Sequence, residues 1–79
     1  MRIKINWNGM IFDGELQRSV QNDERGTKIL TKITIPKTED SINAFIMWPV
    51  KQNVSFECHP DGTGEYSLAS ETATSYIFE

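Results

Sequence analysis

Cysteine and histidine, the side chains that most often supply a nucleophile and its base, occur once each and side by side, as Cys58 and His59. Neighbouring side chains in a strand point to opposite faces, so in the strand expected here these two cannot form a nucleophile–base hydrogen bond. A free cysteine usually behaves as a buried apolar side chain. We therefore expect Cys58 in the core and His59 at the surface beside Glu65, with no thiol chemistry.

Metal-binding and acid–base chemistry have equally few candidates. Zinc needs several convergent Cys or His ligands, and the chain has two such residues in total. Asp61, Thr63 and Glu65 alternate in a glycine-containing loop, but a calcium loop needs more carboxylate ligands than these. Asp13 and Glu15 are expected on a solvated face, each opposite a basic residue, as a salt ladder. The sequence therefore predicts no enzyme, no cofactor and no metal site.

The element that positions most of these residues is an opening hairpin over residues 2–16. Its turn is Asn8-Gly9, the residue pair that most readily adopts the positive φ angles of a type I′ turn. A two-residue loop fixes the register, with Trp7 opposite Met10. One face of this hairpin is then apolar, and it consists of Ile3, Ile5, Trp7, Met10, Phe12 and Leu16. The other face is charged, with Arg2, Lys4, Asp13 and Glu15 as opposite-charge cross-strand pairs.

A third strand is expected to extend this hairpin into a meander. The stretch Asp23-Glu24-Arg25-Gly26 has turn chemistry, and the strand after it, residues 27–35, is rich in β-branched residues. This turn pairs Val20 with Ile29. We expect Ile29, Ile33 and Ile35 to join the apolar face of the opening hairpin.

A second hairpin and a final strand are expected towards the end of the chain. Apolar and polar residues alternate from residue 54 to residue 59, and the loop over residues 60–64 is made of turn-forming residues. A five-residue loop pairs Cys58 with Tyr66, and Phe56 with Leu68. Residues 74–78 are predicted as a last strand at an edge of the sheet.

One short helix, around residues 39–48, is expected to cover the apolar face. Thr38 is a good N-cap, Ile42, Phe45 and Ile46 have helical spacing, and Pro49 is a suitable stop. The alternative is a buried strand over residues 42–48, because the continuous apolar run there does not distinguish the two.

These elements predict an α+β fold that is mainly β. A twisted antiparallel sheet of about five strands, made of the meander and the second hairpin, is covered by the helix. The alternative is an all-β small barrel or sandwich. With 79 residues, the chain is expected to form a single domain over residues 1–79.

Charge and apolar patterning narrow the choice of partners. The net charge of −3 argues against direct binding to nucleic acid, because basic residues must neutralise the phosphates. The same charge suits a protein partner with a basic surface. The longest apolar run, Ala44–Trp48, is too short to cross a bilayer. No apolar run of a signal peptide is present, so we expect a cytoplasmic location and no membrane.

The function that these observations favour is a non-enzymatic protein–protein binding module. The candidate contact residues are acidic side chains at turns, together with one tryptophan beside a proline: Asp23, Glu24, Glu39, Asp40 and Trp48. Small acidic proteins without catalytic motifs are typical of phage or mobile-element inhibitors, including inhibitors of host defence proteins that target nucleic acid. We therefore expect a protein of this type, acting through its acidic turns.

Two other functions remain open. One is a structural or accessory subunit of an oligomer, including a homo-oligomer, because a core of this size is marginal on its own. The other is a small-barrel binder of single-stranded nucleic acid, in which Trp7, Phe12 and Phe56 would stack on bases. Those three aromatic residues are expected on the core face, which argues against the second alternative.

Overall fold

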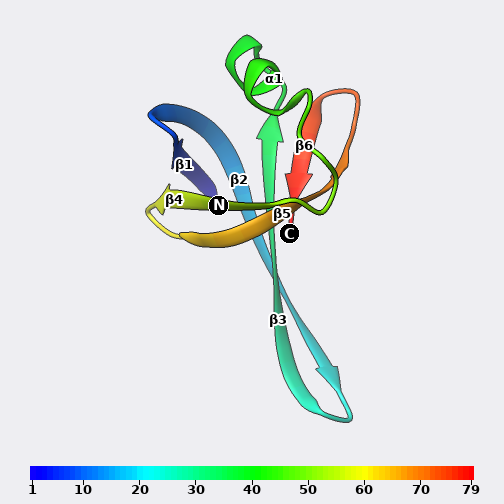
Figure 1. Cartoon of the computed structure of the whole chain (residues 1–79). Coiled ribbons are helices and arrows are strands. Elements are labelled where there is room, and N and C mark those ends of the chain that lie inside the picture. The colour runs from blue at the N-terminus through cyan, green and yellow to red at the C-terminus, as the bar shows by residue number, and fades with distance from the viewer.

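The computed structural model describes all of residues 1–79 and contains six strands and one helix (Figure 1). In chain order these are β1 (Arg2–Trp7), β2 (Met10–Asp23), β3 (Gly26–Pro36), α1 (Glu39–Phe45), β4 (Asn53–His59), β5 (Gly64–Glu71) and β6 (Ser75–Phe78). The antiparallel strands pair in the order β1-β2-β3-β6-β5-β4, and β4 also pairs with β1, so the sheet closes into a barrel. The predicted α+β, mainly β class is confirmed, with six strands in place of about five.

The opening hairpin has the predicted turn and register. Asn8 and Gly9 have φ angles of 51° and 79°, and Trp7 lies opposite Met10. The predicted apolar face points into the barrel. Most of its side chains are buried, whereas Trp7 and Met10 are only partly buried against the core. The turn chemistry of two residues therefore fixes which side of both strands becomes the interior.

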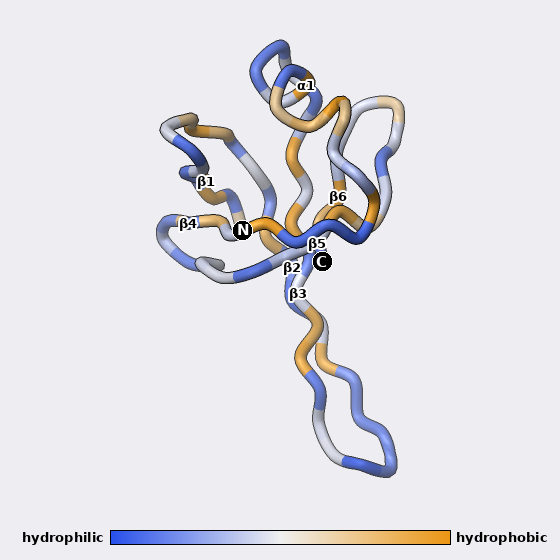
Figure 2. Tube along the Cα trace, viewed as in Figure 1, coloured by the Kyte–Doolittle hydropathy of each residue, from blue (hydrophilic) through white to orange (hydrophobic).

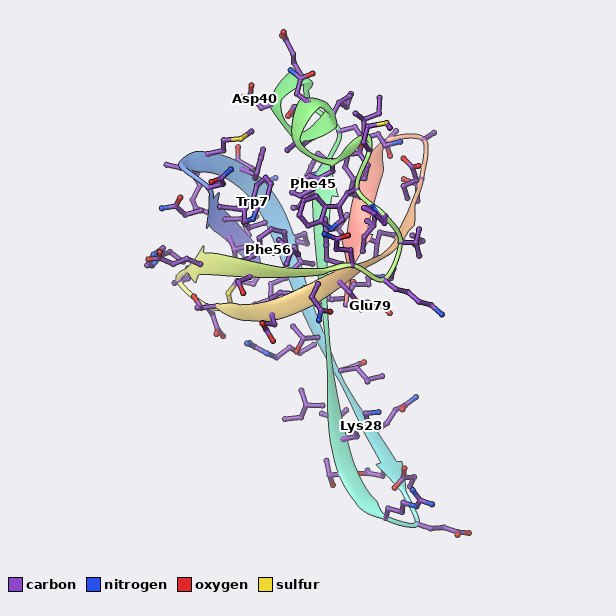
Figure 3. All side chains as sticks on the ribbon, viewed as in Figure 1. Trp7, Lys28, Asp40, Phe45, Phe56 and Glu79 are labelled. Atoms are coloured by element: carbon purple, nitrogen blue, oxygen red, sulfur yellow. The ribbon has the colours of Figure 1, made fainter.

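The core fills the barrel, and α1 closes one of its ends. Phe45 is 1% exposed and its ring centroid lies 5.1 Å from that of Phe78 and 5.6 Å from that of Phe12. Figure 3 shows Phe45 reaching from α1 towards the barrel that holds Phe56. The predicted helix is confirmed but ends at Phe45, and the alternative of a buried strand over residues 42–48 is wrong.

The second hairpin has a different register from the predicted one. Phe56 lies opposite Gly64, not Leu68. The last residues of β4 pair with β1 instead of β5, and the hydroxyl of Thr63 accepts the Cys58 N–H at 2.8 Å and donates to the Cys58 carbonyl oxygen at 3.0 Å. A side chain thus satisfies the backbone groups that a longer hairpin would have used. The predicted alternation of faces survives, because the partner of each residue changes by four positions, which is an even number.

The prediction of β6 as an edge strand is wrong. β6 lies between β3 and β5, with Ile33 opposite Phe78 on one side and Leu68 opposite Phe78 on the other. Tyr76 and Phe78 are both buried. The apolar side chains of β6 complete the core, and the position of the strand between β3 and β5 removes them from water.

The β2–β3 hairpin extends far beyond the barrel. Its pairing continues without a break from Leu16 opposite Ile33 to Asp23 opposite Gly26. We call the part beyond the Leu16–Ile33 pair, residues 17–32, the arm; Figure 1 shows it projecting from the barrel at the end opposite α1. The molecule is therefore elongated, with extents of 43 × 25 × 20 Å. Ile29, expected on the core face, is 63% exposed because the arm has no core beneath it.

Candidate functional site

The predicted contact residues lie at two opposite ends of the molecule. Glu39, Asp40 and Trp48 belong to α1 and the segment after it, whereas Asp23 and Glu24 are at the tip of the arm. Figure 3 shows this separation, with Asp40 on the helix and Lys28 well down the arm. The structure thus offers two candidate surfaces and does not bring the five residues into one site.

The first surface begins at a tightly capped helix. The hydroxyl of Thr38 accepts the backbone N–H of Ser41 at 3.2 Å. In return the Ser41 hydroxyl accepts the Thr38 N–H at 2.8 Å and donates to the carbonyl oxygen of Pro36, also at 2.8 Å. This reciprocal cap holds the first turn of α1 in place, and Glu39 and Asp40 are exposed there without an ion-pair partner.

Apolar side chains surround the other end of α1. Trp48 packs edge-on against Trp7 with 5.4 Å between ring centroids, and its Nε1–H donates to the carbonyl oxygen of Gln52 at 3.3 Å. Ile46 is 65% exposed and Met47 is 88% exposed. We call α1 with residues 46–50 and Trp7 the α1 pole. It combines half-buried tryptophans, exposed apolar side chains and two unpaired carboxylates, the composition of a protein-binding surface.

The second surface is the arm. Every residue from 17 to 30 is exposed, including Val20 at 64% and its cross-strand partner Ile29. Figure 2 shows apolar segments partway along both strands of the arm and a hydrophilic tip. A hairpin that buries no side chains contributes little to the core. Its exposed apolar pair therefore indicates a role outside the fold.

The arm also has a different charge from the barrel. It carries four of the eight basic residues (Arg18, Arg25, Lys28 and Lys32) but only the acidic Asp23 and Glu24, which gives it a net charge of +2. Since the whole chain has a net charge of −3, the rest of the molecule has −5. The two ends of the molecule therefore favour partners of opposite charge.

One bidentate ion pair ties the base of the arm to the barrel. Arg18 Nη1 lies 2.6 Å from Asp61 Oδ2, and Arg18 Nη2 lies 3.0 Å from Asp61 Oδ1. The hydrogen bonds from Arg18 and from the Gly62 N–H hold the pKa of the Asp61 carboxyl below its usual value. Nearby, the Tyr66 hydroxyl donates to the carbonyl oxygen of Gly62 at 2.5 Å, and burial raises the pKa of Tyr66.

The side chains considered for catalysis, Cys58 and His59, lie in different environments. Cys58 is buried and burial raises the pKa of its thiol, whereas His59 is exposed. The predicted neighbour of His59 is wrong: its Nε2 lies 3.2 Å from Glu57 Oε1, because Glu65 pairs with Ser55 instead. No group of three or more His, Cys, Asp or Glu side chains is close enough together to hold a metal ion.

A shallow depression of about 680 Å³ lies over the charged outer face of β1 and β2. The two carboxylates of its lining are paired, since Lys4 contacts Asp13 and the N-terminal amino group lies 2.9 Å from Glu15 Oε1, whereas Arg2 forms no ion pair. The predicted cross-strand partner of Lys4 is confirmed. These exposed ion pairs form a salt ladder on the surface of the depression.

Sequence reasoning missed the arm as a separate surface. A signal was present, because Arg18 and Asn22 interrupt the apolar face of β2, and that face alternates regularly only up to Leu16. A strand whose two faces are both largely polar has left the core.

The structure contains no helix with both the length and the apolar composition that crossing a membrane requires.

Comparison with known proteins finds no matching family model, no similar curated protein and no similar solved structure.

Proposed function

We propose that this protein is a non-enzymatic protein-binding module whose α1 pole contacts a partner with a basic surface. The observation that carries the proposal is that exposed apolar side chains, Ile46 and Met47, lie at the same end of the molecule as carboxylates without an ion-pair partner, those of Glu39 and Asp40. Apolar contact supplies affinity, and the carboxylates supply orientation and fast association with a cationic surface.

Trp48 is the anchor of this surface in the proposal. Its ring is half-buried against Phe45 and Trp7, so little side-chain freedom is lost when a partner covers its remaining surface. Amphipathic aromatic side chains in fixed rotamers are the commonest hot spots of interfaces.

The specific version of this proposal is a small acidic inhibitor, of phage or mobile-element type, that acts on a host defence protein. Proteins that bind nucleic acid present basic surfaces to the phosphates. An acidic pole competes for such a surface, which supports this class of target. The phage or mobile-element origin rests on the small size, the acidity and the lack of catalytic motifs of the chain, and the cytoplasmic location rests on its apolar patterning.

The test separates the two groups of acidic residues that the sequence suggested. A tagged protein is used to capture partners from a lysate of the host, in three forms: unaltered, with Glu39→Lys and Asp40→Lys, and with Asp23→Lys and Glu24→Lys. We expect the first double variant to lose the captured protein and the second to retain it. Retention by the α1-pole variant contradicts the proposal.

The other two functions have distinct outcomes. A stable homo-oligomer in light scattering, dissociated by Met47→Glu, favours the accessory subunit. A change in tryptophan fluorescence with single-stranded oligonucleotides at low salt favours the nucleic-acid binder. Of the three suggested stacking residues, Phe12 and Phe56 are buried and Trp7 is partly buried against the core, so we expect no such change.

A further inference from the structure

The arm has an open sheet edge along β3, and the direction of its backbone groups follows from neighbouring hydrogen bonds. The N–H and C=O of Glu79 both bond to Ser67 of β5, at 3.0 Å and 2.9 Å. Groups alternate sides along a strand, so Phe78 faces β3 and its partner Ile33 faces β6. By the same alternation, the backbone groups of Thr27, Ile29 and Thr31 point to the side that β6 occupies beside the barrel.

No strand occupies that side along the arm. The pairing of β3 with β6 ends at Ile33 opposite Phe78, whereas the pairing of β3 with β2 continues to Gly26. The N–H and C=O groups of Thr27, Ile29 and Thr31 therefore face solvent. Figure 3 shows Glu79 at the point where the arm leaves the barrel, so the open edge begins where β6 stops.

The side chains along this edge differ between its two faces. Ile29 lies on one face with its cross-strand partner Val20, and both are exposed. Lys28 and Lys32 lie on the other face, opposite Gln21 and Gln17, and neither lysine forms an ion pair. The edge thus has an apolar side and a cationic side, with Leu30 between the two lysines.

We infer that the β3 edge of the arm, residues 27–31, binds an extended acidic strand of a partner protein by β-addition. The backbone groups of Thr27, Ile29 and Thr31 provide the ladder. Carboxylates of the added strand face Lys28 and Lys32, and its alternate residues, which are β-branched, cover Ile29. A two-stranded ribbon is marginally stable by itself, so a third strand also stabilises the arm.

Charge decides between this occupant and a second copy of the chain. When two β3 edges pair antiparallel, Lys28 and Lys32 of each copy lie near those of the other, and like charges across strands are destabilising. Lysines on an edge are a common protection against self-pairing. Nucleic acid fits less well, because Ile29, Leu30 and Val20 occupy the middle of the arm and Asp23 and Glu24 its tip.

This surface is separate from the α1 pole, so its test is independent of the proposed function. The probe is a blocked peptide of about nine residues in which Glu and Val alternate, titrated at low salt and followed by amide NMR. We expect slowed hydrogen exchange at the amides of Thr27, Ile29 and Thr31. The amides of Lys28 and Leu30, which already bond to β2, serve as the internal reference. A peptide of alternating Lys and Val is expected to bind at least about tenfold more weakly.

Two proline variants form a matched pair. Ile29→Pro removes an outward N–H from the β3 edge, whereas Val20→Pro removes one from the opposite edge of the same residue pair. We expect the first to weaken peptide binding about tenfold and the second to leave it unchanged, with both chains folded by their amide spectra. Absence of peptide binding, or binding without the alternating protection, overturns the inference. So does a dimer of the free protein that Ile29→Pro dissociates, or an oligonucleotide complex that Lys28→Glu abolishes and Ile29→Pro does not.

Discussion

Gly14 lies on β2 where the backbone passes close to the core side chain of Ile5. A Cβ at this position would lie 2.6 Å from Ile5 Cδ1 and 3.3 Å from the Thr34 carbonyl oxygen. Ile5 is fully buried and has little room to move. We expect Gly14→Ala to lower the free energy of unfolding by about 1–3 kcal/mol, measured by urea denaturation.

The companion variant Ile5→Val removes the Cδ1 atom that the new methyl group would meet. The double variant is therefore expected to be more stable than the sum of the two single changes predicts. Strict additivity would mean that the close approach is not the cause of the loss.

The Arg18–Asp61 pair makes the free energy of unfolding depend on pH in the acidic range. Because the pKa of Asp61 is lowered on folding, its ionised form contributes stability above the unfolded-state pKa of about 3.8. That contribution is lost as the pH falls through the lower folded-state value. In urea unfolding between neutral pH and pH of about 2, the difference between the unaltered chain and Asp61→Asn is expected to be constant at first and to shrink in acid. A difference that grows as the pH falls contradicts this assignment.

Cys58 is expected to be unreactive in the folded protein. It is 3% exposed, and burial raises the pKa of its thiol, so the reactive thiolate is disfavoured and hidden. We expect a thiol reagent to label it only as fast as the protein unfolds. The control is the Ser55→Cys, Cys58→Ala variant, in which the cysteine is on the exposed face of β4, and which we expect to label rapidly. Equal rates would show that β4 opens locally.

At the scale of elements, α1 depends on Ser41 more than on its intrinsic propensity. A helix of 7 residues is too short to be stable alone, and the buried Ser41 hydroxyl bonds to both Thr38 and Pro36. Ser41→Ala leaves these two backbone groups without that partner, and we expect it to cost about 1–3 kcal/mol.

The matched variant is Thr38→Ser, which keeps the capping hydroxyl and is expected to be nearly neutral in the same denaturation experiment. If both variants are neutral, the cap does not hold the helix on the barrel.

The arm is expected to be dispensable for folding. Replacing residues 20–29 with Asn-Gly joins Ser19 to Leu30, whose backbone groups face β2, through a type I′ turn and keeps the Arg18–Asp61 pair. Because the deleted residues are all exposed, we expect the near-ultraviolet circular dichroism of the core aromatics to be unchanged. Loss of this signal would mean that the arm helps the barrel to fold.

At the scale of the whole molecule, local features were predictable and the neighbours of each strand were not. Asn8-Gly9 and Thr38 act on adjacent residues, so the turn, the register of β1 and β2 and the start of α1 follow from the sequence. The pairing of β3 with β6 does not, because it depends on how the sheet closes. The register of β4 with β5 differs from the predicted one because the Thr63 side chain bonds to the Cys58 backbone, a contact that strand alternation cannot reveal.

The candidate surfaces show the same division. The exposure of Glu39, Asp40, Asp23 and Glu24 agrees with their polar character. Their separation to opposite ends depends on how far the β2–β3 hairpin extends beyond the barrel. That length was not predictable from β3, because its alternation continues from the core into the arm without a visible boundary. Whether the residues act as contacts stays a prediction.

The position of β6 has a consequence for how the protein is made. The ring closes only when β6, residues 75–78, enters between β3 and β5, and Lys4 of β1 must also find His59 of β4, more than fifty residues away. On a ribosome, the β1–β3 meander and the β4–β5 hairpin are synthesised before the strand that joins them. The nascent chain therefore carries two unjoined sheet edges until residue 78 has emerged. Closure then brings together residues far apart in the chain, which makes folding slow for a protein of this size.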